Sequence, residues 1–409
     1  MPVPFFAFLQ ANARWLGAGY LLALFSGFGQ TFFISLFAGD LRAEFDLSHG
    51  DFGLIYMAAT LLSALCLSSV GRTVDVFPIQ RVAAVVMLAL AAFCVSMATV
   101  NSVVMLFVTI FGLRLCGQGM MTHTSMTAMG RWFSAQRGRA VSIAILGFPT
   151  AEALFPISFV ALSNAIGWRG AWGFAAAILV ALSMPVILTL LRADRQPKSL
   201  ESDGTNVIGR QWTRAEVLRD PVFWAACLGV LAPPFIGTAI LFHQVYLVEL
   251  RGWPLELFAS AFVVMAVVSV ATSLVLGGLI DRYTAVRLMP GLLVPMAAAC
   301  FVLAYFTSQA APFIFMALFG MSSGITATLI GALWPEIYGV RHIGAIRAVA
   351  FALMVFASAA GPGLVGWLID LGIDYDFQLA GMGLYCILMS VVLTLASKTA
   401  RLRDKQPGN

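Results

Sequence analysis

Long apolar runs alternate with short polar connections along the whole chain. Most runs reach about twenty residues, the length that an α-helix needs to cross a ~30 Å hydrocarbon core. A transmembrane barrel would instead show short segments of alternating hydrophobicity. The pattern therefore predicts an all-α membrane protein with twelve transmembrane helices. The predicted spans are residues 15–39, 51–70, 79–99, 102–128, 138–163, 168–191, 222–248, 257–277, 285–306, 311–334, 343–369 and 377–397.

Composition supports an integral membrane protein and argues against other classes. The chain is 60% hydrophobic and only 11% charged, whereas about a quarter of a soluble domain is charged. The net charge of +5 does not indicate nucleic-acid binding, because the basic residues gather in loops at the membrane edge. The six cysteines lie in apolar runs without C-x-x-C spacing, so we expect neither a structural disulfide nor a metal site. The N-terminus lacks the basic region of a signal peptide, and we expect the first span to be retained.

Lysine and arginine are concentrated in alternate connections. If both termini are cytoplasmic, the outer connections carry only Arg42, Arg169 and Arg251, and the other basic loop residues lie inside. Cytoplasmic loops of membrane proteins carry such an excess of Lys and Arg. We therefore expect a multi-pass protein of the bacterial cytoplasmic (inner) membrane with both termini in the cytoplasm.

The twelve predicted spans divide into two sets of six. A mixed-charge stretch with Gly, Ser and Pro interrupts them. We predict an N-terminal six-helix bundle over residues 1–192, a cytoplasmic linker over 193–221 and a C-terminal six-helix bundle over 222–409. Near the end of the linker, Thr213-Arg-Ala-Glu216 has the spacing of a capping box and predicts a short interfacial helix. A solvated turn is the alternative.

One loop pattern occurs in both halves. Gly71-Arg72-Thr73-Val74-Asp75 follows the second span, and Gly277-Gly278-Leu279-Ile280-Asp281 follows the eighth, about 206 residues later. Together with Arg114 in span 4 and Gly361-Pro362-Gly363 in span 11, these loops resemble the major facilitator superfamily over essentially the whole chain. The segments Arg131-Trp132-Phe133-Ser134 and Asp370-Leu371-Gly372 are similar to its monocarboxylate and oxalate–formate branch.

The resemblance implies two pseudo-symmetric six-helix bundles and a secondary transporter that works by alternating access. It also implies that the two repeated loops are inner-side gating latches. Arg137 is the expected partner of Asp75, and a plain surface ion pair worth under ~1 kcal/mol is the alternative. The residues assigned to gating are Asp75, Arg81, Arg137, Asp281, Arg282 and Arg287.

Two ionised side chains, Arg114 and Glu152, lie deep in apolar runs, where a charge is expensive. Each is roughly 11 or 12 residues from the outer end of its span, so both are expected near mid-membrane. Three interpretations stay open: Arg114 binds an anionic substrate by a bidentate contact, Glu152 carries a proton, or the two form a structural ion pair. The first two are compatible, because a substrate bound to Arg114 would release Glu152 for protonation.

Other candidates for substrate binding are polar or aromatic residues within the spans or near the outer mouth. Gln118 lies one helical turn after Arg114 and could share its ligand, although the superfamily pattern has Gly at that position. Phe33 could stack on a planar solute and His243 could donate a hydrogen bond, but both are also consistent with packing. The full set of additional candidates is Gln30, Phe33, Gln118, His243 and Gln244.

We predict a proton-coupled secondary transporter for a small organic solute. Because no second deep cation accompanies Arg114, a two-carboxylate anion fits poorly, and a mono-anion, a zwitterion or a neutral vitamin-like compound stays open. No Walker A motif or catalytic dyad is present, so we expect no enzyme activity and no cofactor. A uniporter or exchanger without proton coupling and a non-transporting membrane sensor are the alternatives. The expected partners are the substrate, the lipid bilayer and protons, with no nucleic acid and a monomeric state.

Overall fold

The computed structural model describes residues 5–133, 136–192, 211–339 and 341–404. Every regular element over these residues is a helix. The all-α fold class predicted from the apolar pattern is thus confirmed. Residues 193–210, which form most of the predicted linker, lie outside the described residues.

Over the described residues, ten helices are long and apolar enough to cross a membrane, or eleven if the bent pair Ala7–Gly29 and Thr31–Phe45 forms one span. One of the ten, Gly138–Leu190, has 53 residues. That is about 80 Å of helix, more than twice the thickness of a bilayer core. Gly167 interrupts it with φ 76° and ψ 160°, outside the helical range. Divided at Gly167, this stretch supplies the predicted fifth and sixth spans, and the count reaches the predicted twelve.

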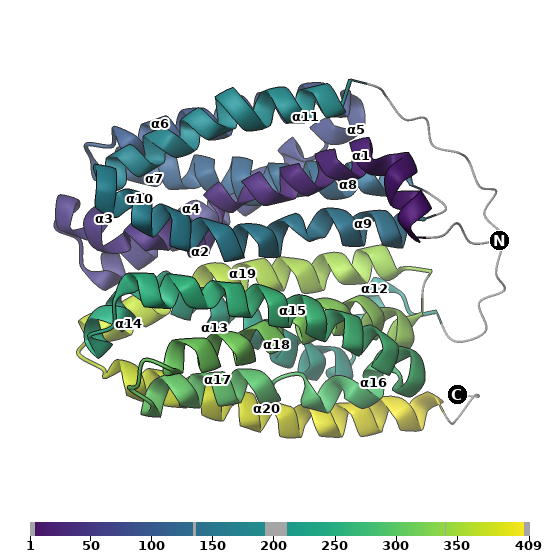
Figure 1. The fold of residues 1–409 in the computed structure, drawn as a ribbon. Coiled ribbons are helices and arrows are strands. Elements are labelled where there is room, and N and C mark those ends of the chain that lie inside the picture. The colour runs from purple at the N-terminus through teal and green to yellow at the C-terminus, as the bar shows by residue number, and fades with distance from the viewer. Residues whose placement is uncertain (1–4, 134–135, 193–210, 340, 405–409) are drawn as a thin grey trace. The chain divides into compact units, whose positions relative to one another are not determined.

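The chain folds into two compact units, of which the first comprises Met1–Leu47 and Ile55–Asp203. Within it, α1 packs on α8, α9 and α10, and α6 packs on α7 and α10 (Figure 1). The fourth span is built from α7, η3 and α8. The helices of this unit are α1 (Phe5–Phe25), η1 (Ser26–Gly29), α2 (Thr31–Ile34), η2 (Ser35–Phe37), α3 (Ala38–Phe45), most of α4 (His49–Val70), α5 (Thr73–Val76), α6 (Ile79–Ala98), α7 (Val103–Leu113), η3 (Arg114–Met121), α8 (Thr122–Trp132), α9 (Arg137–Ile145), α10 (Gly147–Ile178), η4 (Leu179–Ser183) and α11 (Met184–Leu190).

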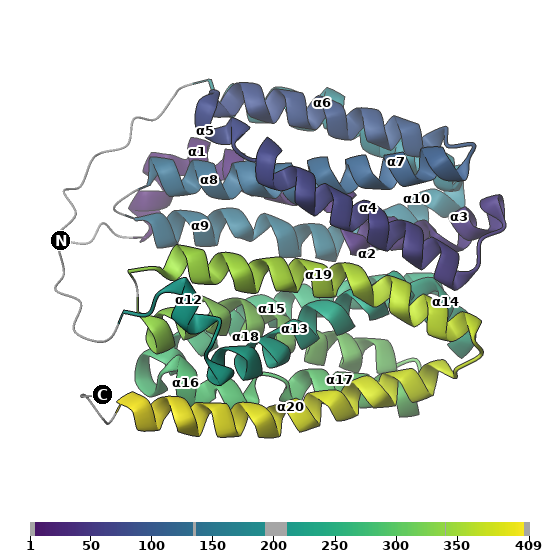
Figure 2. The ribbon, with the colours of Figure 1, turned by 180° about the vertical axis from the view of Figure 1, so that it is seen from behind.

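The second unit comprises Ser48–Leu54 and Gly204–Asn409, so it includes the first turns of α4. In this unit α15 packs along α18, α13 along α19, and α17 along α20 (Figure 2). Its helices are α12 (Arg214–Val217), α13 (Pro221–Phe242), α14 (Gln244–Arg251), α15 (Leu255–Tyr283), α16 (Ala285–Leu288), η5 (Met289–Gly291), α17 (Val294–Tyr305), α18 (Ala311–Tyr338), α19 (Ile343–Asp370) and α20 (Tyr375–Asp404).

Some helix boundaries in the two units match at the offset of about 206 residues that separates the repeated segments. The eight-residue helices α3 and α14 correspond, and each ends at a left-handed residue, Asp46 (φ 51°) or Gly252 (φ 64°). The next helices begin at His49 and Leu255, at the same offset. A left-handed residue after the last turn is a common way to end a helix. The internal repeat therefore extends from the two loops to the elements around them.

An arginine joins three segments at the predicted outer end of the first unit. Arg169 pairs with Glu44 of α3, with 3.0 Å between Nη2 and Oε1. It also donates hydrogen bonds to the carbonyl oxygens of Ala98 (3.0 Å) and Val100 (2.8 Å). Carbonyls at a helix C-terminus lack partners within the helix. Arg169 therefore caps the end of α6 while it holds the end of α3.

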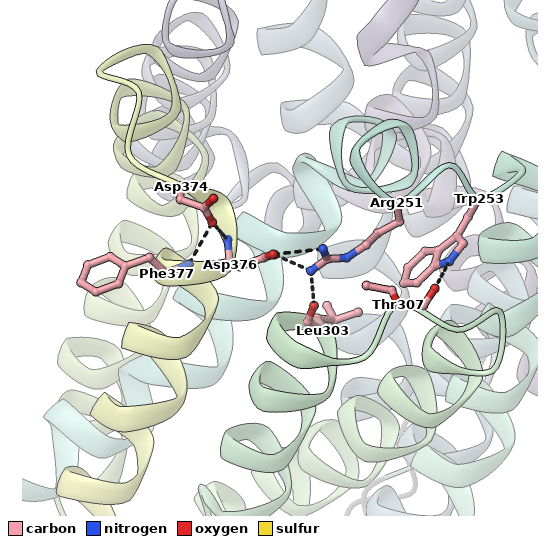
Figure 3. Close-up of polar contacts among 7 residues, drawn as sticks. All are labelled: Arg251, Trp253, Leu303, Thr307, Asp374, Asp376 and Phe377. Carbon is pink, nitrogen blue, oxygen red and sulfur yellow. Dashed lines mark hydrogen bonds and ion pairs between the residues drawn. The ribbon is translucent and has the colours of Figure 1, made fainter.

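The second unit has the same arrangement with the two charges exchanged (Figure 3). Arg251, the last residue of α14, pairs with Asp376 of α20 and donates to the carbonyl oxygen of Leu303 (2.6 Å) in the last turn of α17. Arg251 takes the place of Glu44, and Asp376 takes the place of Arg169, both at an offset of 207 residues. We call these two arrangements the outer clamps.

A buried carboxylate joins three helices at the predicted inner end of the second unit. Asp220 accepts hydrogen bonds from both terminal nitrogens of Arg403 in α20 (2.8 and 2.9 Å) and from the hydroxyl of Tyr338 at the end of α18 (2.8 Å). Burial raises the pKa of Asp220. The hydrogen bonds from Arg403, Tyr338 and the Val222 amide outweigh burial, so the pKa lies below its ordinary value. The carboxylate is therefore held in its charged form.

The short helix predicted near the end of the linker is present as α12. Thr213 Oγ1 accepts a hydrogen bond from the Glu216 amide (3.4 Å), and Glu216 Oε2 accepts one from the Thr213 amide (2.7 Å). These reciprocal bonds make a capping box. The short helix and its capping box are thus present, and its position at the membrane surface stays a prediction.

Candidate functional site

The centre of the predicted site lies in a π-helical segment of the fourth span. α7 ends at Leu113, and residues Arg114–Met121 form η3 before α8 continues. π-helical turns are rare and occur frequently at functional sites. Gly117 of η3 lies against the first span, because a Cβ at this position would be 2.6 Å from the Cα of Gly29. The absence of a side chain at Gly117 therefore permits the close approach of the first span.

The first span breaks where it meets η3. η1 ends at Gly29, and Gln30 has extended dihedral angles (φ −88°, ψ 155°) before α2 begins. A Cβ at position 29 would lie 2.1 Å from the carbonyl oxygen of Leu113, so the close contact requires glycine. An interrupted helix leaves carbonyl groups without helical partners. The Gly29 carbonyl is one of these, and a side chain of η3 supplies its donor.

That donor is Arg114, whose side chain is buried, with 1% of the residue exposed. Its Nη1 donates to the Gly29 carbonyl oxygen (3.1 Å) and to Thr31 Oγ1 (3.4 Å). The guanidinium carbon lies 5.2 Å from the ring centroid of Tyr56 in α4, within the range of a cation–π interaction. The Tyr56 hydroxyl and Thr31 Oγ1 are also hydrogen-bonded, 2.6 Å apart. The first, second and fourth spans therefore meet at this guanidinium.

The other side of the guanidinium is unsatisfied. Arg114 Nε and Nη2 have no hydrogen-bond partner among the described residues, although both atoms are buried. Nearly all buried polar groups in proteins are paired, and an unpaired one costs about 1–3 kcal/mol, or more when it is charged. This edge of Arg114 therefore carries donors that the described residues leave unused.

Sequence reasoning missed Thr31 and Tyr56. The available signal was a hydroxyl group within each of two apolar spans. Hydroxyl side chains are common between packed membrane helices, so that signal does not single out these two residues. Their relation to Arg114 depends on the bend at Gln30, which the sequence pattern did not predict.

The ion pair considered between Arg114 and Glu152 is not formed. Glu152 lies half-buried on α10, and within the described part of the chain no hydrogen bond or ion pair joins it to Arg114. Equal depth along two helices does not determine which way their side chains point. Here the contacts of Arg114 are with the first and second spans. The roles of Arg114 and Glu152 in substrate and proton binding stay predictions.

The two predicted glutamine ligands differ in their exposure. Gln118 is half-buried in η3, four residues after Arg114, and Gln30 is buried at the break of the first span. The structure gives neither side chain a hydrogen-bond partner among the described residues. Both belong to the segments that carry or contact Arg114.

Phe33 lies in a cluster of aromatic rings inside the first unit. It is fully buried, and its ring makes edge-on contacts with Phe28 (5.1 Å between centroids), Phe159 (4.8 Å) and Trp172 (5.0 Å). Phe28 in turn stacks on Phe155 at 4.7 Å. This placement favours the packing alternative for Phe33, because its edges and faces are already covered.

His243 and Gln244 are buried in the second unit, where α13 ends and α14 begins. His243 Nδ1 lies 3.0 Å from the Ala239 carbonyl oxygen. Its ring is 6.1 Å from that of His49 and 6.3 Å from that of Tyr375. His243 thus lies among aromatic and imidazole rings, and its direct role stays a prediction. Among the described residues, no group of three His, Cys, Asp or Glu side chains is placed to hold a metal ion.

The two repeated segments carry exposed charges. The second segment, Gly277–Asp281, was predicted to be a loop, but it continues helix α15, which ends at Tyr283. Asp75, Arg81, Asp281 and Arg287 are exposed, and none has an ion-pair partner in the part of the chain that the structure describes. Arg282 is also exposed and lies over the ring of the neighbouring Tyr283, 5.1 Å from its centroid. The expected partner of Asp75 is the Arg137 side chain, which lies outside the described residues.

A contact that the sequence did not predict ties the first loop to the fourth span. Arg131, in the last turn of α8, donates from Nη1 to the carbonyl oxygen of Val74 (2.8 Å). In the second unit Glu336 of α18 accepts hydrogen bonds from the amides of Ala285 (2.7 Å) and Val286 (3.3 Å), just after the second loop. In both units, therefore, a charged residue near the predicted inner end of a span holds the backbone of the repeated loop or of the helix after it.

Comparison with known proteins shows distant similarity over most of the chain. The chain is 22% identical over 340 residues to the MFS-type transporter YhjX of Escherichia coli (strain K12), which covers 81% of this chain and 82% of that protein. It is 23% identical over 249 residues to the MFS transporter asaE of Aspergillus flavus, covering 60% of this chain and 53% of that protein.

Solved transporter structures share the fold. A bacterial homologue of the human lysosomal transporter Spinster, in an inward-facing and unoccupied conformation, superposes with a TM-score of 0.67 at 17% identity over the whole of both chains. A mutant of the nucleoside transporter NupG gives 0.66 at 15% identity over 95% of this chain and 99% of that chain. The model of the Major Facilitator Superfamily matches residues 19–362. Since this match covers most of the sequence, the chain belongs to the Major Facilitator Superfamily, a family of membrane transporters.

Proposed function

We propose that the protein is a secondary active transporter of a small organic solute and that Arg114 binds the solute. The observation that carries this proposal is the buried edge of Arg114, where Nε and Nη2 lack hydrogen-bond partners among the described residues. A cation inside a membrane span marks a substrate or ion pathway when it is not neutralised by the protein. An organic anion or a zwitterion supplies the missing acceptors, and a vitamin-like compound does so if it has an acidic group.

Proton coupling is assigned to Glu152. Carboxyl groups inside membrane segments are typical of proton relays, and Glu152 has no ion-pair partner among the described residues. A carboxyl group free of a permanent counter-ion can exchange a proton without first breaking a salt bridge. Solute exchange or uniport without protons is the alternative, in which Glu152 never titrates.

The exposed charges of the repeated loops are assigned to gating, with Asp75, Arg81 and Arg137 in the first half and Asp281, Arg282 and Arg287 in the second. Arg131 and Glu336 support these assignments, because they hold the neighbouring backbone in place. The distribution of Lys and Arg supports cytoplasmic termini in a bacterial inner membrane.

Uptake into proteoliposomes tests the proposal. The purified full chain would be reconstituted and supplied with labelled lactate, nicotinate, an amino acid or a neutral nucleoside, with and without an inward proton gradient. We expect uptake of at least one charged solute, abolished in Arg114→Ala although this variant still inserts. Arg401→Ala removes an exposed arginine near the C-terminus and serves as the matched control. Normal uptake in Arg114→Ala would refute the assignment of the site. Binding without any transport would favour the membrane sensor.

A further inference from the structure

Among the described residues, one nitrogen of the Arg114 guanidinium is hydrogen-bonded and the other two are not. Nη1 faces the Gly29 carbonyl and the Thr31 hydroxyl, whereas Nε and Nη2 are unpaired among the described residues. In a planar guanidinium, Nε and Nη2 share one edge, and their N–H bonds along it are parallel. Two parallel donors match the two oxygens of one planar oxyanion. From this edge, and resting on the proposed function, we infer that the solute carries a carboxylate that binds side-on to Nε and Nη2.

A single carboxylate also matches the charge of the site. Arg114 contributes one positive charge, and no second cation lies as deep in the spans. A phosphate monoester carries about −1.5 to −2 at neutral pH, so it would leave uncompensated negative charge in apolar surroundings, which is costly. A primary amide offers one acceptor oxygen, but its NH₂ group would face the second N–H donor of the guanidinium. The site should therefore distinguish a carboxylate from its own amide.

Thr31 and Tyr56 hold the guanidinium so that this edge keeps its direction. The Thr31 hydroxyl touches both Nη1 and the Tyr56 hydroxyl, and the Tyr56 ring lies below the guanidinium. Rotation of Arg114 would break the bond to Gly29 and move the plane away from the ring. Thr31 and Tyr56 are thus positioning residues, which act on the solute through Arg114.

Matched pairs of probes test the carboxylate. The thermal midpoint of the purified full chain would be measured with millimolar nicotinate against nicotinamide, lactate against lactamide, and inorganic phosphate. We expect at least one carboxylate to stabilise the protein, with its amide and phosphate at least tenfold weaker. In Arg114→Lys, which keeps the charge but loses the fork, affinity for that carboxylate should fall by about tenfold to a hundredfold. Arg401→Lys should bind as the wild type does.

Three results would overturn the inference. They are a panel in which no carboxylate stabilises the protein, an amide that binds as tightly as its carboxylate, and an Arg114→Lys variant with undiminished affinity. If Arg114→Lys fails to fold, the comparison of each carboxylate with its amide still decides whether a carboxylate binds, and Tyr56→Phe and Tyr56→Leu test the positioning of Arg114. The phenylalanine variant keeps the ring and should retain most of the preference for carboxylate over amide, whereas the leucine variant should lose it. Equal preference in both would overturn the role of the ring.

The two proposals fail separately. Uptake of a solute without an acidic group, at a rate unchanged in Arg114→Lys, would overturn the inference that the solute carries a carboxylate. The proposal that the protein is a transporter would stand. Carboxylate binding that depends on Arg114, with no transport of the bound compound in proteoliposomes, would support the carboxylate inference. It would overturn the proposal that the protein transports this solute.

Discussion

Replacing Gly29 with alanine would push the first and fourth spans apart at the point where Arg114 is held. The added Cβ would lie 2.1 Å from the Leu113 carbonyl oxygen and 2.7 Å from the Gly117 Cα. An ordinary carbon–oxygen contact is about 3.3 Å or longer, so the two backbones would have to separate by about 1 Å. Neither contact is with a flexible side chain, and no rotamer change can relieve it.

The expected effect is large for a single methyl group. Overpacking of a tightly packed interior costs typically 1–3 kcal/mol, and two backbone contacts place Gly29→Ala at the upper end, about 3 kcal/mol. Separation also lengthens the bond between Arg114 Nη1 and the Gly29 carbonyl, now 3.1 Å. We therefore expect solute affinity to fall by at least tenfold, as loss of one hydrogen bond to a charged group implies.

A thiol-reactive dye can follow thermal unfolding, since five of the six cysteines are buried. Gly173→Ala is the matched control, because a Cβ there has no atom within 4 Å, and it should be neutral or stabilising by up to ~1 kcal/mol. A Gly29→Ala variant with the thermal midpoint and solute affinity of Gly173→Ala would refute the contact between these spans.

Three further changes have expected outcomes. Glu152→Gln should abolish the pH dependence of uptake while leaving solute exchange intact, and a full pH response in proteoliposomes would move the proton role elsewhere. Asp220→Asn should destabilise the protein by about 1.5–3 kcal/mol. The folded-state pKa of Asp220 is lowered, so its contribution to the free energy of unfolding is present above the ordinary carboxyl pKa of ~4. This contribution is lost as pH falls through the folded-state pKa. The thermal midpoints of variant and wild type should therefore converge in acid. Reversing both charges of the outer clamp, Glu44→Arg with Arg169→Glu, should recover part of the stability that either change loses alone, and strict additivity in the double-mutant cycle would contradict the ion pair.

Much of the fold could be predicted from the sequence, because the bilayer imposes a length and a polarity on each span. The break at Gly167 follows the predicted end of the fifth span, although helical structure continues on both sides of it. The capping box of Thr213 and Glu216 depends on local spacing alone, and it was predicted correctly. Local patterns and span lengths are therefore the features that transfer from sequence to structure.

The environment of Arg114 could not be predicted in the same way. Depth along a span follows from residue counts, but the direction of a side chain depends on helix rotation and on breaks such as that at Gln30. Glu152 had the right depth but is not paired with Arg114. Tyr56 contacts the guanidinium through its ring, and an aromatic face gives no polar signal in a sequence.

The exchanged charges of the outer clamps have a consequence for assembly: they oppose the pairing of a span from one bundle with the other bundle in the same bilayer. Bundles of similar shape offer similar docking surfaces, and a sixth span from one could insert against the other during biogenesis. Glu44 would then meet Asp376, and Arg251 would meet Arg169, so each wrong pairing brings like charges together, whereas the native pairs are joined at 3.0 Å. Like-charge repulsion is a common means of rejecting a wrong partner. Because the charges are reversed between the repeats, each half favours pairing with its own last span over pairing with the last span of the other half.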